Sequence, residues 1–187
     1  MSGWRAYLLE HWAEPFGPAS RGARAALAVV ALLLRLYAAG VVGFVVAAIG
    51  LGELGVLNNI GFLPYGYDKL FGGNAAYAMG PEFFQGLGMP FPAATSLLIG
   101  LLEFFGGLAL IAGLLTRPVA LALAGTMVVA LVTVNNWPEE APLLIACLAL
   151  VWLGAGRWSL DALLARRWRA APAPAAEGAA RPQAQRA

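Results

Sequence analysis

Long apolar runs alternate with short polar segments along this chain. Four runs are nearly free of charge, at about residues 25–51, 93–115, 118–136 and 141–156. A helix of about 20 mostly apolar residues crosses the hydrocarbon core of a bilayer. The runs are continuous, whereas the strands of a membrane barrel alternate polar and apolar positions over roughly ten residues. The pattern therefore predicts an all-α protein, an integral-membrane four-helix bundle.

The segments around these runs complete the predicted domain organisation. An amphipathic arm at 1–24 precedes the transmembrane domain at 25–169, and an Ala/Pro-rich tail occupies 170–187. Aromatic residues and a leucine recur every four positions from Trp4 to Phe16. This spacing is typical of a short helix that lies in the membrane interface or packs on a protein. The tail has no core to build, and we expect it to be disordered.

The composition changes this picture only by excluding classes of protein. Of 187 residues, 60% are hydrophobic and 12% are charged, which is far from the usage of soluble domains. A single Cys147 and a single His11 exclude an intrachain disulfide, a two-histidine haem and a histidine-based metal site. The net charge of +2 gives no reason to expect nucleic-acid binding. Any redox function would therefore need electrons from a partner protein.

The charged residues outside the runs fall on two sides. Arginines gather on one side, at Arg21, Arg24, Arg117, Arg157, Arg166, Arg167 and Arg169. Carboxylates gather on the other, at Glu53, Asp68, Glu82, Glu139 and Glu140. Because loops rich in Lys and Arg stay in the cytoplasm, we expect both termini and the turn at Arg117 to be cytoplasmic. The loop at 52–92 is then extracytoplasmic.

Two charged residues, Arg35 and Glu103, lie inside predicted spans. Charges at such positions are costly and usually face the interior of a bundle. Arg35 has two interpretations: it extends to the cytoplasmic interface, or it pairs with Glu103 and closes one side of a pocket. Glu103 is near mid-span and too short to reach the interface. Gly106 and Gly107, one turn later, would admit a flat ligand or simply a neighbouring helix.

The extracytoplasmic loop is rich in aromatic residues, among them Tyr67 and Phe71. Its prolines and glycines exclude one continuous helix, so we expect short interfacial helices or a re-entrant segment that roofs the bundle. An aromatic belt at the level of the lipid head groups is the plainer alternative. Thr126 and Thr133, in the third run, are expected to hydrogen-bond to their own helix backbone.

Four short stretches resemble the DoxX family of small four-helix bacterial membrane proteins. They are Leu34-Arg35-Leu36, Gly66-Tyr67-Asp68-Lys69-Leu70-Phe71, the glycine-rich segment 100–117 around Glu103, and Gly156-Arg157-Trp158-Ser159-Leu160-Asp161. The resemblance implies a location in the bacterial cytoplasmic (inner) membrane and importance for Arg35, Lys69, Glu103 and Arg117. The separation between Arg35 and the Gly-x-x-Lys-Leu-Phe motif is about twice that of relatives, and we therefore expect the motif to lie in the outer loop.

The family also implies a link to quinone-dependent redox chemistry. The leading hypothesis is a membrane subunit of a quinone-linked oxidoreductase, with a pocket between the first and second spans under the aromatic lid. Glu103 would accept or relay a proton, and Arg35 or Lys69 would polarise a carbonyl. The expected walls are Gly106, Gly107, Tyr67 and Phe71. Quinone is the one cofactor expected, with no metal site and with electrons supplied by a partner protein or larger membrane complex.

Two other functions fit the same residues. The chain could be a non-catalytic structural or assembly subunit of a larger membrane complex, in which Arg35 and Glu103 set the register of the helices. It could also bind or transport a small hydrophobic molecule. The sequence does not discriminate among the three.

Overall fold

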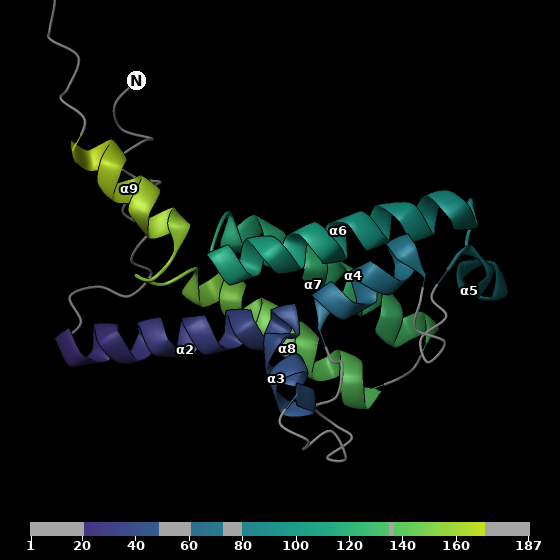
Figure 1. Ribbon diagram of the computed structural model, residues 1–187, viewed down its shortest axis with the longest axis horizontal. Coiled ribbons are helices and arrows are strands. Elements are labelled where there is room, and N and C mark those ends of the chain that lie inside the picture. The colour runs from purple at the N-terminus through teal and green to yellow at the C-terminus, as the bar shows by residue number, and fades with distance from the viewer. Residues whose placement is uncertain (1–20, 49–60, 73–79, 135–136, 171–187) are drawn as a thin grey trace, which may run out of the picture.

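The computed structural model describes residues 21–48, 61–72, 80–134 and 137–170, and all of the secondary structure in these ranges is helical (Figure 1). The helices are α2 Arg21–Ala39, α3 Val41–Ala48, α4 Phe62–Phe71, α5 Pro81–Gly86, α6 Pro92–Ala112, α7 Thr116–Thr133, α8 Trp137–Leu153 and α9 Leu160–Ala170. Most of the predicted arm and nearly all of the predicted tail lie outside the described residues.

Three of these helices, α2, α6 and α7, are long and apolar enough to cross a membrane. A shorter apolar segment, Glu140–Leu153, forms most of α8. The predicted class, an all-α membrane protein, is therefore confirmed. The predicted second and third runs match α6 and α7 to within a few residues.

The core of the bundle mixes leucines with small residues. Leu110, Leu123 and Leu150 are fully buried, and so are Ala38 and Ala120. Lipid provides no hydrophobic force to drive helices together, so their association depends on close packing, which small side chains permit. Large apolar side chains also cover the outside of the helices, and Leu98, Leu121, Val132 and Ile145 are among the most exposed. Apolar groups both inside and outside are typical of a protein surrounded by lipid.

The prediction of one first span from 25 to 51 is wrong, because the helix breaks at Gly40. Gly40 has a φ of 93°, a left-handed conformation that glycine adopts without steric cost. Helix α2 ends at Ala39 and α3 leaves in another direction, while α4 continues the line of α2 beside α6 (Figure 1). Gly61, which precedes α4, lies directly against Gly40, and a Cβ on Gly61 would overlap its backbone.

The Gly-x-x-Lys-Leu-Phe motif is expected in an outer connection made of short interfacial helices or a re-entrant segment, and the structure shows a short helix there that is part of the bundle. This motif forms most of α4, which packs against α6 within the bundle. Gly66 permits the contact, because a Cβ there would collide with the backbone of Phe104. Gly40 and Gly61 touch, although they are far apart in sequence. The motif therefore keeps its place beside α6 despite the longer connection.

Candidate functional site

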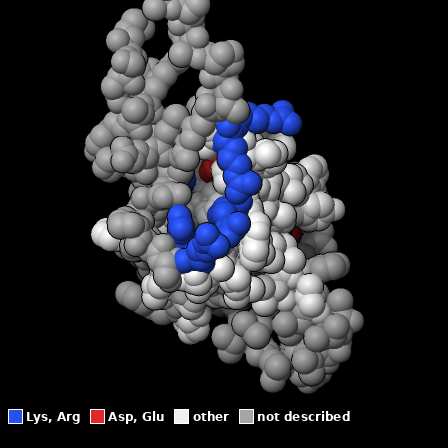
Figure 2. All heavy atoms as spheres, turned by 90° about the vertical axis from the view of Figure 1, so that its left-hand side faces the viewer, with Lys and Arg blue, Asp and Glu red and all other residues white. Residues whose placement is uncertain are grey.

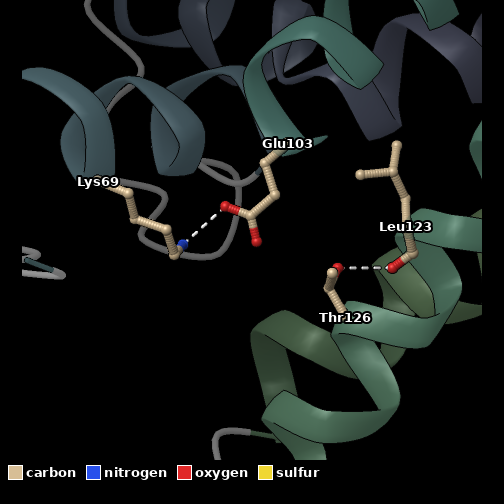
Figure 3. A network of polar contacts seen from close by, with 4 residues as sticks. All are labelled: Lys69, Glu103, Leu123 and Thr126. Carbon is tan, nitrogen blue, oxygen red and sulfur yellow. Dashed lines mark hydrogen bonds and ion pairs between the residues drawn. The ribbon is translucent and has the colours of Figure 1, made fainter. Parts of the chain in front are cut away.

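An ion pair joins α4 to α6 near the end of the bundle that holds α5. The Nζ atom of Lys69 lies 2.7 Å from Oε2 of Glu103, and the two side chains are 6% and 3% exposed. Lys69 projects from α4 and Glu103 from α6, so that they meet between the helices (Figure 3). Burying two charges is favourable only when each compensates the other. The pair is therefore a site where the fold depends on both partners.

Of the two interpretations of Arg35, the geometry decides against a pair with Glu103. Among the described residues, Glu103 forms its ion pair with Lys69, whereas Arg35 donates hydrogen bonds to backbone carbonyl oxygens. The break at Gly40 explains why Lys69 takes the place instead, since it brings α4 alongside the middle of α6.

A small cavity of about 90 Å³ adjoins the ion pair. Its polar lining comes from Lys69, Glu103 and four further residues, Tyr65, Thr126, Thr133 and Glu140. The rest of the lining is apolar and comes from α5, α6, α7 and the segments next to them. The predicted pocket position, between the first and second spans, is therefore wrong in one respect. No described residue of α2 lines this cavity, and α7 forms the wall opposite α6, as Figure 3 shows for Thr126.

Helix α5 and the residues after it cover one side of the cavity. Phe83, Phe84, Leu87 and Met89 all contribute to the lining. Phe84 is buried, and its ring packs edge-on against Phe83 with centroids 5.4 Å apart. Pro81 begins this short helix, where proline is favoured because its missing N–H has no partner in the helix anyway. Helix α5 and the residues after it thus form an apolar wall of the cavity beside the ion pair.

The four residues expected to form the pocket walls do not line the cavity. Gly106 packs against Leu123 and Gly107 against Leu63, so both glycines allow close helix packing and leave no space for a ligand. Tyr67 and Phe71 are 54% and 63% exposed, and their rings contact each other with centroids 5.0 Å apart and planes tilted by 42°. They lie one turn apart on α4, and neither lines the cavity.

Arg35 is buried at the other end of the bundle. Its side chain is 1% exposed, so it is enclosed by protein. Its Nη2 donates a hydrogen bond of 2.7 Å to the carbonyl oxygen of Trp158, and its Nη1 donates one of 3.5 Å to that of Ile111. Arg35 therefore ties α2 to the end of α6 and to the segment between α8 and α9.

Asp161 makes a second set of backbone contacts at this end. Its Oδ1 accepts a hydrogen bond of 2.8 Å from the amide of Leu115, and its Oδ2 accepts one of 3.0 Å from that of Thr116. Its own amide donates to the carbonyl oxygen of Gly113 at 3.0 Å. We call Arg35, Asp161 and the backbone groups they bind the inner clasp. It uses charged side chains to satisfy the polar ends of helices.

Sequence reasoning missed Glu140 as part of the site. It was grouped with Glu139 as one of the extracytoplasmic charges, but it is 7% exposed and lines the cavity. Its burial depends on how α8 is rotated about its axis, which the sequence pattern of two adjacent glutamates does not reveal. That Glu140 is the first residue of the apolar segment of α8 was the available signal.

The threonine prediction is confirmed. The hydroxyl of Thr126 donates to the carbonyl oxygen of Leu123, and that of Thr133 to that of Val129, each at 2.8 Å. Both also line the cavity. Their oxygen atoms thus add polarity to the α7 wall without leaving a donor unpaired.

These observations define a helical membrane protein with a buried lysine–glutamate pair beside a small, mostly apolar cavity. A family model described as DoxX matches residues 56–136, which contain both members of the pair. The chain is 33% identical over 123 residues to the inner membrane protein YqjF of Escherichia coli (strain K12), and the match covers 60% of this chain and 90% of that relative. The chain belongs to the DoxX family. No solved structure matches it.

Proposed function

We propose that this protein is a membrane subunit of a quinone-linked oxidoreductase that binds a quinone head group in the cavity beside Lys69 and Glu103. The observation that carries the proposal is that a buried ion pair lines a cavity whose other walls are mostly apolar. At about 90 Å³, the cavity is well below the volume of pockets that hold drug-sized ligands. A single ring with two carbonyls suits this size, and its apolar tail would extend between helices into lipid.

The two charged residues would have different tasks. A lysine ammonium has three N–H donors, and one of those of Lys69 is engaged by Glu103. Another would donate to a head-group carbonyl and draw electron density towards its oxygen. Glu103 would accept or relay a proton at its carboxylate. A bound quinone supplies the redox chemistry by taking up two electrons and two protons, and the electrons come from a partner protein.

We also propose that α2, α6, α7 and α8 cross the bacterial inner membrane as a four-helix bundle with cytoplasmic termini. Helix α8 has 17 residues, or about 26 Å at 1.5 Å per residue, which is close to the bilayer core. The arginine-rich end holds the start of α2 and the turn before α7, and it would face the cytoplasm. The cavity would then lie in the extracytoplasmic half of the membrane.

Photolabelling of the full-length protein in its native membrane complex tests quinone binding. An azido-quinone should label peptides from α5 or α7, and excess unlabelled quinone should compete with it. Glu103→Gln should reduce quinone-dependent electron transfer at least tenfold. Glu82→Gln, the same substitution at an exposed residue of α5, should leave it unchanged.

Other results would support the alternative functions. If native protein gives no competed label, and electron transfer survives Glu103→Gln but is lost when the whole subunit is deleted, the protein is an assembly subunit. If a lipid-like molecule copurifies in the cavity and no electron transfer is found, it is a binder or transporter of that molecule. Melting curves of each variant identify any that fail to fold.

A further inference from the structure

The inner end of the bundle carries an excess of exposed positive charge. Five arginines are exposed there, namely Arg21, Arg24, Arg157, Arg166 and Arg167. Figure 2 views this end directly and shows Lys and Arg side chains gathered across it. Among the described residues, Asp161 is the carboxylate at this end, and its two oxygens are already bound to backbone amides. Within the part of the chain that the structure describes, the exposed guanidinium groups therefore have no other carboxylate beside them.

Helix α9 presents apolar side chains at the same end. Leu160, Leu163 and Leu164 are 41%, 45% and 41% exposed, and their i, i+3, i+4 spacing places them on one face of the helix. Arg166 and Arg167 lie one turn further along. Figure 1 shows α9 projecting away from the ends of α2 and α6. Leucines on one face with arginines beside them are typical of a helix that lies in a membrane interface.

The start of α9 is fixed at the level where the apolar helices end. The Ser159 hydroxyl accepts a hydrogen bond of 3.1 Å from the amide of Ala162, which caps the helix. Asp161 holds the first turn of α9 to the start of α7. Trp158, just before it, is 53% exposed, and tryptophan is enriched at the boundary between lipid and water. These contacts hold the start of α9 beside the end of α6 and the start of α7.

We propose that α9, with Arg157, Arg166 and Arg167, binds the anionic head groups of phospholipids at the inner surface of the bilayer. The leucines would enter the boundary between head groups and acyl chains, and the guanidinium groups would bind lipid phosphates bidentately. Each basic residue near an anionic membrane surface raises lipid affinity by about fivefold. This inference is independent of any quinone in the cavity at the other end.

A fluorescent label on α9 tests the proposal in the full-length protein. Leu163→Cys would carry an environment-sensitive bimane, since Cys147 is buried and does not compete for the reagent. In nanodiscs that contain phosphatidylglycerol, the label should be shielded from aqueous iodide. In nanodiscs of phosphatidylcholine alone, it should be several-fold more accessible. Arg166→Gln/Arg167→Gln should abolish this difference and reduce the binding of spin-labelled phosphatidylglycerol by about 25-fold, or fivefold for each arginine.

A matched pair of variants separates α9 from the general charge of this end. Arg21→Gln/Arg24→Gln removes the same number of charges from α2 and should leave the label shielded in phosphatidylglycerol. Equal loss of shielding in the two double variants would overturn the proposal in favour of diffuse surface charge. A label that is shielded equally in both lipids and in detergent would overturn it in favour of a protein surface over α9. A label accessible in every condition would show that α9 does not lie on lipid.

Discussion

Charged side chains are buried at both ends of this bundle, but their partners differ in kind. Lys69 and Glu103, which we call the outer pair, lie near α5, where they neutralise each other and face a cavity. At the inner clasp, Arg35 and Asp161 bind backbone carbonyls and amides at the ends of helices. The outer charges therefore depend on another side chain, whereas the inner charges depend on the path of the main chain.

This difference separates residues available for chemistry from residues committed to structure. The hydrogen bonds of Arg35 and Asp161 hold three segments far apart in sequence, and replacing either would leave backbone groups unsatisfied. Lys69 and Glu103, by contrast, hold no backbone group in any hydrogen bond given above, and both line the cavity. Judged by burial alone, Arg35 and Glu103 would be equally good candidates for a functional role. Of these two sets of residues, only Lys69 and Glu103 line the cavity.

The largest expected effect is the loss of one member of the outer pair. Lys69→Met would leave Glu103 as an uncompensated buried charge and lower the free energy of unfolding by about 3–5 kcal/mol. Lys69→Met/Glu103→Leu should recover most of this loss, because an apolar pair of similar size replaces the charges. Thermal unfolding in detergent can be followed through the reactivity of the buried Cys147 thiol. A Lys69→Met variant as stable as the native protein would contradict the buried pair.

A smaller effect is expected at the inner clasp. Arg35→Met removes two backbone hydrogen bonds, and Asp161→Ala removes two more. Each should lower the free energy of unfolding by about 1–3 kcal/mol, measured by the same thiol assay. Variants that remain folded should keep the binding of any cavity ligand unchanged, because neither residue lines the cavity. A tenfold loss of ligand affinity in folded Arg35→Met would break the distinction between the two ends.

The smallest effect on stability is expected for Glu140→Gln. The amide has nearly the same shape as the carboxylate, so the free energy of unfolding should change by less than about 1 kcal/mol. The variant should instead flatten the pH dependence of quinone affinity, because it removes one of the titratable groups of the cavity. Glu82→Gln serves as the control, since Glu82 is exposed at the same end. An identical pH profile for Glu140→Gln and native protein would show that the charge of Glu140 does not affect quinone affinity.

Particular residues show how far prediction from sequence reached. Glu103 stands in an apolar run with few charges, so its burial and importance follow from the cost of a charge in lipid. Lys69 was identified through its motif, but its location beside α6 was not predicted, because many residues separate the motif from the first span. Local pattern gave no sign that Gly40 and Gly61 touch, since that contact joins positions distant in sequence. Glu140 was missed for the related reason that its burial depends on the rotation of α8.

Taken by itself, the sequence determined the membrane class, the approximate extents of α6 and α7, and the separation of basic from acidic ends. These properties depend on composition and local periodicity, which act within one helix at a time. Only the tertiary structure decided that α2 ends at Gly40, that α4 joins α6, and that Glu103 pairs with Lys69 while Arg35 binds the backbone. Each of these follows from close approach between helices, which depends on where glycines from separate segments meet.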